Sequence, residues 1–185
     1  RPQDDNSGVR FPRGTADVVY AGGLVWAGYV RDSGSVNPRV GGQTYNYGTR
    51  PGRIISKGVA ESSNDSTVRI YRVRRDWDTA DLSRDAAEVN DVKYDSVTQA
   101  MIDAVRHQYK KDWLEWQWQK GAPYYDRNNN GVYDPDTTAH YDSTKDEPGC
   151  ANADQVVWFV ANDLRASATA ALIFDCASPF FKILK

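Results

Sequence analysis

The sequence predicts a mainly β protein: an antiparallel, sandwich-like domain with one long and one short α-helix and a calcium-loop-like insertion. Aromatic residues make up 12% of the 185 residues, with 6 Trp and 11 Tyr, and such side chains are enriched in strands. Short apolar runs, such as residues 18–20 and 156–161, are bounded by polar residues or glycines, which is typical of β domains. Only residues 97–119 show a long helical period.

We expect one domain with an extension at each end, which suits the length of the chain. Residues 1–16 are polar and contain two prolines, which indicates an extended N-terminal arm. Residues 17–172 are expected to form the single β-rich domain, and residues 173–185 an apolar C-terminal tail. Gly, Ser, Asn, Arg and Pro dominate residues 31–67, so much of that stretch is expected to be loop.

The first apolar residues of the domain lie between Asp17 and Val30. Gly22 and Gly23 divide them, and two strands joined across a Gly-Gly turn are the natural interpretation. A continuous strand with a glycine bulge is the alternative.

A further strand is predicted over residues 68–74, which are rich in β-branched and aromatic side chains and carry arginines on one face. A short helix follows over about 79–89, capped by Asp78 or Thr79. Its apolar residues lie on one side, which predicts packing of that side on the domain.

The long helix is expected over about 97–119, because Ser96 and Gln99 have the spacing of a capping box. Its apolar residues recur every three or four positions: Met101, Ile102, Val105, Tyr109, Trp113 and Trp116. Six consecutive apolar residues at 156–161 then predict a central strand buried on both faces. The apolar residues 166–185 predict one more strand.

The most specific pattern is an alternation of oxygen-bearing side chains in residues 126–136. It matches the first nine positions of an EF-hand-type calcium loop, in which oxygens at positions 1, 3 and 5 converge, glycine turns the chain at 6 and a carbonyl binds from 7. A hard cation such as Ca2+ prefers these ligands. The expected ligands are Asp126, Asn128, Asn130, the carbonyl of Val132, Asp134 and Asp136, with Gly131 at the turn.

The end of this loop departs from the pattern. Position 12, where a bidentate carboxylate normally closes the site, is Thr137. Asp136, or the later Asp142, Asp146 and Glu147, would have to complete the shell. The alternative is a solvated turn without an ion, because Asn, Asp and Gly favour turns by themselves.

Charge is unevenly distributed along the chain. Residues 126–163 contain eight acidic and two basic residues, a charge of −6, whereas the whole chain carries −2, which leaves +4 for the remainder. Carboxylates at that density repel one another unless a cation or solvent screens them. The near-neutral total gives no argument for nucleic acid, and no apolar run reaches the ~20 residues of a membrane span.

The sequence does not predict an enzyme. Phosphate-binding glycine motifs, a nucleophile elbow and a zinc-protease motif are absent. The pairs Asp134 and Asp136, or Asp146 and Glu147, could serve a hydrolase as acid and base. They lie, however, in the polar, acidic loop that we expect over residues 126–149, where calcium or solvent explains them better.

Three other side chains have chemistry that could bind a ligand. His107 is expected on the surface of the long helix, and His140 is interpreted as a bystander in the acidic loop rather than a metal ligand. Trp118 lies off the apolar stripe of the long helix, which makes it a candidate platform for stacking a sugar ring.

The two cysteines and the first residue give information about the cellular compartment in which the protein functions. Cys150 and Cys176 could pair in an oxidising environment or remain as two free thiols, and the sequence leaves both possibilities open. The chain begins at Arg1 rather than Met, which indicates either a mature terminus left after removal of an export signal or a fragment.

Several segments, taken together, resemble a known family: residues 22–28, 69–77, 121–135, 146–149 and 153–163. The set is similar to an uncharacterised N-terminal domain of exported and cell-surface proteins of the Bacteroidota–Ignavibacteria group, and it covers most of residues 18–172. The resemblance implies export and no established activity. Two features depart from that family: Cys150 replaces an aliphatic residue, and after about Leu172 neither the usual further strands nor a sorting domain follows.

We therefore expect a secreted structural or cell-surface module that calcium stabilises. We expect it to assemble with copies of itself into an extracellular structure such as a filament, through exchange of strands or arms. A carbohydrate-binding module of an exported protein, with a glycan as partner, is the alternative.

Overall fold

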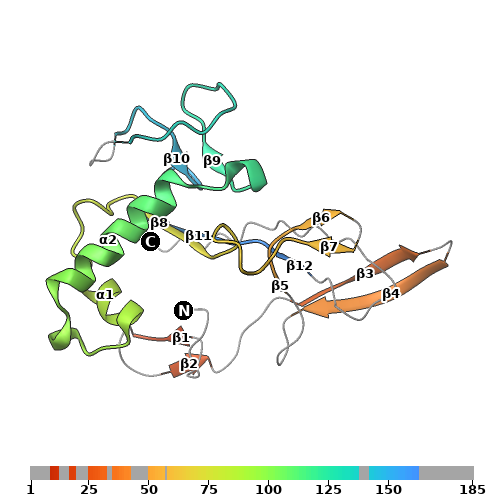
Figure 1. The fold of residues 1–185 in the computed structure, drawn as a ribbon, viewed down its shortest axis with the longest axis horizontal. Coiled ribbons are helices and arrows are strands. Elements are labelled where there is room, and N and C mark those ends of the chain that lie inside the picture. The colour runs from red at the N-terminus through yellow and green to blue at the C-terminus, as the bar shows by residue number, and fades with distance from the viewer. Residues whose placement is uncertain are drawn as a thin grey trace. The chain divides into compact units, whose positions relative to one another are not determined.

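The computed structural model describes residues 9–12, 17–19, 25–32, 35–42, 50–56, 58–137 and 142–162. These residues belong to two compact units (Figure 1). The first, which we call the strand unit, contains the described residues up to 68 together with 161–162. The second, the helical unit, contains residues 69–160 and carries the acidic loop. The predicted single domain over 17–172 stays a prediction, and residues 173–185 lie outside the described part.

The strand unit is built from short antiparallel pairs. The pairs are β1 (Val9–Arg10) with β2 (Asp17–Val19), β3 (Val25–Asp32) with β4 (Ser35–Gly42), β5 (Arg50–Pro51) with β12 (Ala161–Asn162), and β6 (Ile54–Ser56) with β7 (Val59–Ala60). Each pair is a separate two-stranded sheet in the described residues.

Two predictions concern this unit. The Gly-Gly turn expected at residues 22 and 23 lies outside the described residues, and the strands on either side of it have other partners in the described part: β2 pairs with β1 and β3 with β4. Residues 35–42 lie in the stretch expected to be loop, yet they form β4. Pairing with β3 along eight residues supplies the ladder that the weak strand propensity of this Pro- and Gly-containing segment does not predict.

The helical unit combines two helices with two further strand pairs (Figure 1). Its elements are β8 (Tyr71–Arg74), α1 (Ser83–Asn90), the 3-10 turn η1 (Tyr94–Ser96), α2 (Gln99–Leu114), the 3-10 turn η2 (Trp118–Lys120), β9 (Tyr124–Tyr125), β10 (Glu147–Pro148) and β11 (Gln155–Trp158). β8 pairs with β11 and β9 with β10, both antiparallel.

The chain is therefore a mixed α/β protein with small antiparallel sheets, and the predicted sandwich is not confirmed: every sheet among the described residues has two strands. The prediction that residues 156–161 form a strand buried on both faces is also wrong. Burial alternates along β11, with Val156 and Trp158 buried, and Phe159 just beyond it is 38% exposed. This alternation is typical of a strand with one face on the core.

α1 begins later than predicted, at Ser83 rather than near residue 79. The carbonyls of Trp77, Asp78 and Ala80 accept hydrogen bonds from the guanidinium of Arg106 at 2.6, 2.7 and 3.0 Å. Carbonyls held in this way by α2 are not available for the first turn of a helix, so the chain forms a turn here instead.

α2 is shorter than predicted, and its cap is a different residue. Thr98 caps it, with its hydroxyl accepting from the Met101 N–H at 3.4 Å, whereas Ser96 ends the preceding 3-10 turn. The helix ends at Leu114. Trp116 lies beyond that end, where its indole N–H donates to the Pro123 carbonyl at 2.8 Å.

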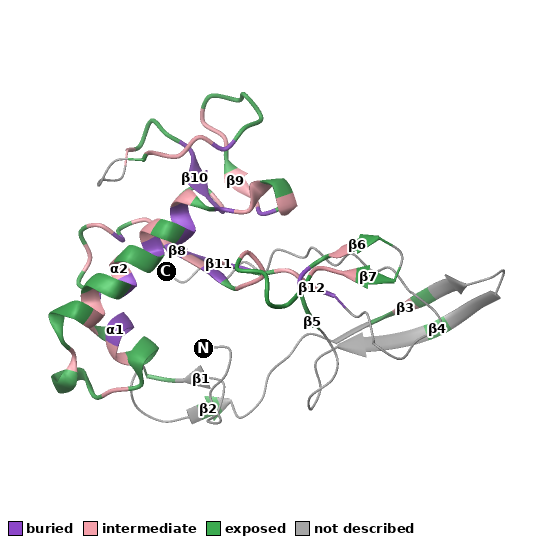
Figure 2. Cartoon of the chain, in the orientation of Figure 1, coloured by how far each residue is buried: buried purple, intermediate pink, exposed green. Residues whose placement is uncertain are grey.

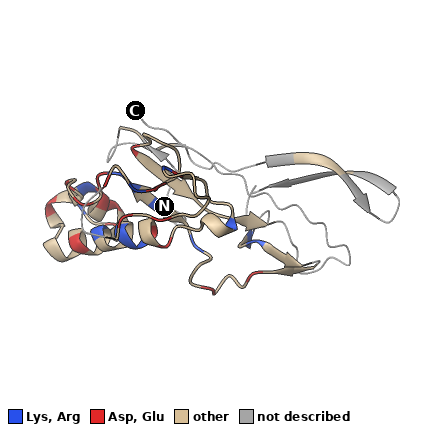
Figure 3. Cartoon of the chain, turned by 90° about the horizontal axis from the view of Figure 1, so that it is seen from above, with Lys and Arg blue, Asp and Glu red and all other residues tan. Residues whose placement is uncertain are grey.

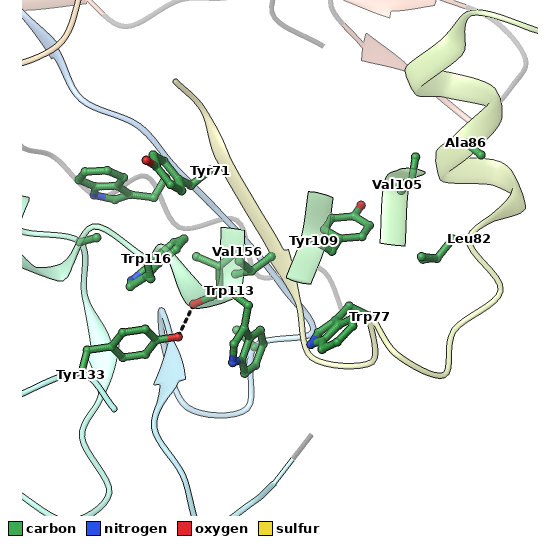
Figure 4. Packing of buried hydrophobic residues seen from close by; sticks show 14 residues of the cluster. Tyr71, Trp77, Leu82, Ala86, Val105, Tyr109, Trp113, Trp116, Tyr133 and Val156 are labelled. Carbon is green, nitrogen blue, oxygen red and sulfur yellow. Dashed lines mark hydrogen bonds between the residues drawn. The ribbon is translucent and has the colours of Figure 1, made fainter. Parts of the chain in front are cut away.

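The core of the helical unit is largely aromatic (Figure 4). The rings of Tyr71 and Trp116 meet edge-on with centroids 6.3 Å apart, and Trp158 lies 5.9 Å from Tyr71. Along α2 the apolar residues Val105, Tyr109 and Trp113 are buried at intervals of four, as the predicted apolar stripe requires, whereas Met101 and Ile102 are half-buried (Figure 2). The core residues are Tyr71, Val73, Trp77, Leu82, Ala86, Val105, Tyr109, Trp113, Trp116, Ala122, Tyr133, Ala153, Val156 and Trp158.

Candidate metal site

The acidic loop, residues 126–146, leaves the helical unit at one strand pair and returns to it at the same place. β9 and β10 pair with Tyr125 opposite Glu147 and Tyr124 opposite Pro148. Directly beyond this pair, the Gly149 N–H donates to the Pro123 carbonyl at 2.7 Å. The two ends of the loop are therefore held together at its base.

The turn at the start of the loop is closed around the Asp126 side chain. One carboxylate oxygen of Asp126 accepts from the N–H of Asn130 at 3.2 Å, and the other accepts from the N–H of Gly131 at 2.8 Å. Gly131 has a φ of 76°, and Asn129 before it has a φ of 56°. Glycine and asparagine tolerate this left-handed backbone best, so the predicted role of Gly131 as the turn residue is confirmed.

The amide side chains of Asn128 and Asn130 also form hydrogen bonds within this turn. The side-chain oxygen of Asn128 accepts from the Asn130 N–H at 3.0 Å, and that of Asn130 accepts from the Val132 N–H at 2.7 Å. The amide nitrogen of Asn128 donates to the two carboxylate oxygens of Asp134 at 3.2 and 3.4 Å. The side chains of Asn128 and Asp134, positions 3 and 9, are thus in direct contact, and the side chains of Asp126 and Asn128 share the Asn130 N–H.

The donor atoms in this turn suit a hard cation. A carboxylate has about four acceptor sites and an amide oxygen two, so Asp126, Asn128 and Asn130 keep acceptor capacity beyond the hydrogen bonds given above. All of these donors are oxygens, as Ca2+ requires. Among the described residues, no three carboxylate, imidazole or thiolate side chains form a metal-binding group. An ion here would rest on Asp126 and Asp134 together with amide and carbonyl oxygens.

Asp146, which the sequence offered as a closing ligand, has a different position. It is 2% exposed, and one of its oxygens accepts from the backbone N–H of Arg127 at 2.9 Å. The other accepts from the backbone N–H of Asp134 at 3.1 Å. Both oxygens of this buried carboxylate are engaged with the backbone of the loop.

Glu147 is also buried and is engaged by two guanidinium groups. Arg75, just after β8, donates to one of its oxygens from Nη2 at 2.5 Å and from Nε at 3.1 Å. Arg127 donates to the other oxygen, and its guanidinium lies 4.9 Å from the ring centre of Tyr125. A buried carboxylate needs such paired charges, so Glu147 ties the loop to the core.

The carboxylates of the loop act on two nearby tyrosines. Burial raises the pKa of Tyr133, and the charges of Asp146 and Glu147 raise it further. Desolvation also raises the pKa of Tyr124, and the charge of Asp126 adds to that effect. Desolvation is the larger cause of both shifts, and the negative charges of the loop act in the same direction.

Asp142, another residue proposed for the shell, belongs to a local turn. Its carboxylate accepts from the backbone N–H of Thr144 at 2.8 Å and from the Thr144 hydroxyl at 2.7 Å. These hydrogen bonds lower the pKa of Asp142. Asp136 is half-buried and Thr137 exposed, and the chain is described again from residue 142.

The remaining candidates lie outside the loop turn. Trp118 is half-buried and packs edge-on against Tyr124, with ring centres 5.9 Å apart, so the sugar platform stays a prediction. His107 is exposed on α2, as expected, whereas His140 lies outside the described residues. Cys150 is a half-buried free thiol in the structure. Cys176 lies outside the described residues, so pairing of the two cysteines stays a prediction.

Sequence reasoning missed the acidic partners of the arginine-rich segment at β8. Arg74 binds Asp85 of α1 at 2.9 Å, and Arg69 binds Asp112 of α2. Figure 3 shows acidic and basic residues distributed together along the helices. The arginine face itself was visible in the sequence, and Arg74 also has a local partner in Asp76. Asp85 and Asp112, however, lie 11 and 43 residues from the arginines that they bind, and no local pattern marks them.

Comparisons with protein-family models, curated proteins and solved structures found no match to this chain. The resemblance to a domain of exported surface proteins therefore stays a prediction. In the part of the chain that the structure describes, no helix combines the length and the apolar character needed to cross a membrane.

Proposed function

We propose that this chain is a non-catalytic structural module that a calcium ion stabilises, with Asp126, Asn128, Asn130, Asp134 and the Val132 carbonyl as ligands. The observation that carries the proposal is the inward-folded Asp126 carboxylate, held by the N–H groups of Asn130 and Gly131. The five proposed ligands occupy positions 1, 3, 5, 7 and 9, from which an EF-hand loop draws its ligands.

A bound calcium ion would stabilise the folded state by neutralising the negative charges of the loop. Asp126 and Asp134 lie on the same turn, and Asn128 stands between them with its amide nitrogen directed at Asp134. Coordination by Asn128 would turn its amide oxygen toward the ion and replace this contact with stronger cation–oxygen attraction. A ligand that binds only the folded state raises the free energy of unfolding, by about 2.7 kcal/mol at a concentration 100 times its dissociation constant.

Thermal unfolding in calcium and in chelator tests the proposal. We expect calcium to raise the melting temperature of the whole chain and Asp126→Asn to remove that response. Asp142→Asn is the matched control, because it makes the same charge change in the same loop at a carboxylate engaged with Thr144. A wild-type melting temperature that is equal in calcium and in chelator, together with a flat calorimetric titration, would exclude the calcium site.

The second part of the proposal is that copies of the chain assemble outside the cell. It is supported by the β3–β4 pair, eight residues in each strand, which forms a sheet of two strands in the described residues. An isolated two-stranded pair is marginally stable in water, and its edges can take a further strand. Tyr29 on β3 is 75% exposed, which adds apolar surface to this pair.

Light scattering over a wide concentration range tests assembly. We expect the mean mass to rise with concentration, and we expect a proline at Val40 in β4 to abolish that rise by disrupting the ladder to Ala27. Monomers at every concentration would contradict assembly and leave the calcium proposal intact, since that proposal concerns the helical unit.

A further inference from the structure

We infer that Asp146 is the positioning residue of the acidic loop: its buried carboxylate holds the turn at residues 126–134 in the shape that receives a cation. This inference rests on the proposed calcium site and deepens it. It assigns a different role to a residue that lies beyond the ninth position of the pattern and that the sequence offered only as a possible closing ligand.

The two hydrogen bonds of Asp146 span the turn. Arg127, whose N–H it accepts at 2.9 Å, directly follows the first ligand Asp126, and Asp134, whose N–H it accepts at 3.1 Å, is the ninth position. A single carboxylate therefore fixes the distance between the start and the end of the ligand run. Hydrogen bonds to an ionised acceptor are about twice as strong as neutral ones.

Asp146 is itself held by the core. A bridge pairs it with Pro135 inside the loop, and the next residue, Glu147, begins β10 and binds Arg75 beside β8. Because Asp146 is 2% exposed, water does not compete for its oxygens. The position of the carboxylate is thus set by the folded helical unit and not by an ion.

This arrangement replaces what position 12 supplies in an EF-hand loop. Position 12 here is Thr137, which has no carboxylate to close the site. Asp146 closes the turn through backbone N–H groups instead, so the loop needs less ordering when an ion binds, and reduced ordering raises affinity. Residues that orient metal ligands without touching the metal typically change affinity by about 10–100-fold when they are substituted.

The test compares three forms of the full-length chain: wild type, Asp146→Asn and Asp142→Asn. Asp146→Asn keeps the size of the side chain but turns one accepting oxygen into an N–H2 donor that faces a backbone N–H. We expect Asp146→Asn to weaken calcium binding in calorimetry by about 10–100-fold, and Asp142→Asn to leave it near the wild-type value. Equal affinities of Asp146→Asn and wild type would overturn the inference.

Amide hydrogen exchange in chelator tests the same role without any ion. In the wild type we expect the N–H groups of Arg127 and Asp134 to exchange more slowly than that of Asn129, which lies at the exposed tip of the turn. We expect that protection to be lost in Asp146→Asn and retained in Asp142→Asn. Arg127 and Asp134 amides that exchange as fast as Asn129 in the wild type would overturn the inference even if Asp146→Asn failed to fold.

The two experiments separate this inference from the calcium proposal. If the amides are protected but the wild-type chain does not bind calcium, the positioning role of Asp146 is supported and the calcium site is contradicted. If calcium binds equally well to wild type and to Asp146→Asn, the calcium site is supported and the positioning role is contradicted.

Discussion

The buried carboxylate of Asp112 accepts a hydrogen bond from the backbone N–H of Arg72 at 2.9 Å, and this contact joins the last turn of α2 to β8. The other oxygen of Asp112 binds the guanidinium of Arg69 and the side-chain amide of Gln108. Asp112 is therefore the point where the arginine-rich strand is fixed to the long helix.

We expect Asp112→Ala to lower the free energy of unfolding by about 3 kcal/mol, because it leaves a partly buried guanidinium and a backbone N–H without their acceptor. Glu115→Ala is the matched control: it removes the other acidic partner of Arg69, whose side chain is 51% exposed. We expect a loss of less than about 1 kcal/mol there. Urea unfolding measures both, and equal losses would contradict the role of Asp112.

Gly149, which follows β10, has a φ of 83°, and a Cβ added there would lie 2.5 Å from Cγ2 of Val156. We expect Gly149→Ala to cost about 3 kcal/mol, from the left-handed backbone and from overpacking. Gly131→Ala is the control, measured in chelator, because its φ of 76° is similar and nothing lies within 4 Å of its added Cβ. A loss of about 1 kcal/mol is expected there.

A double variant tests how much the clash with Val156 contributes to the loss of stability in Gly149→Ala. In Gly149→Ala combined with Val156→Ala, the methyl groups that would meet the new Cβ are gone. We expect the double variant to lose less stability than the sum of the two single losses, since residues in contact are not additive. Additive losses would show that backbone strain alone accounts for the cost.

Tyr109 makes stability depend on alkaline pH. Burial is the main cause that raises the pKa of Tyr109 from 10.0 to about 12, and its hydroxyl donates to Asp85 at 3.2 Å. Because the folded pKa lies above the unfolded one, the neutral hydroxyl contributes its full stabilisation below pH 10.0 and loses it as the pH rises to about 12. The loss is on the order of 3 kcal/mol.

We expect Tyr109→Phe to be less stable than wild type at neutral pH and to lose less stability than wild type across that alkaline range. Urea unfolding as a function of pH measures the difference, and the other tyrosines, which both proteins share, cancel in the comparison. Parallel pH profiles of the two proteins would contradict the assignment.

Local features of the chain could be predicted from the sequence. The apolar stripe of α2 and the Gly131 turn depend on spacings of a few residues, which the helical period and the calcium-loop pattern describe. The N-cap of α2 could not be predicted in this way. Ser96 and Thr98 are both good capping residues, and Thr98 caps the helix because Ser96 belongs to the preceding 3-10 turn.

The pairing of distant segments could not be predicted. The segments of β8 and β11 are both recognisable as strands, but nothing in either one shows that Tyr71 pairs with Trp158. The sequence offers Asp146 as a possible closing ligand because its charge is visible, whereas the N–H groups of Arg127 and Asp134 that engage it are not. The backbone N–H groups that a carboxylate will engage cannot be identified from the pattern of side chains in a sequence.

The acidic loop also contributes to the core, through Tyr133. Its buried ring lies 5.5 Å from that of Tyr124, and its hydroxyl donates to the Trp113 carbonyl at 2.7 Å (Figure 4). For protein engineering this means that the loop cannot be replaced by a short linker, because the replacement would leave a hole the size of a tyrosine ring beside α2. Nor can a fluorescent label or an epitope be inserted at the exposed Asn129, because an insertion there would separate Asn128 from Asn130 and break the turn that Asp126 closes.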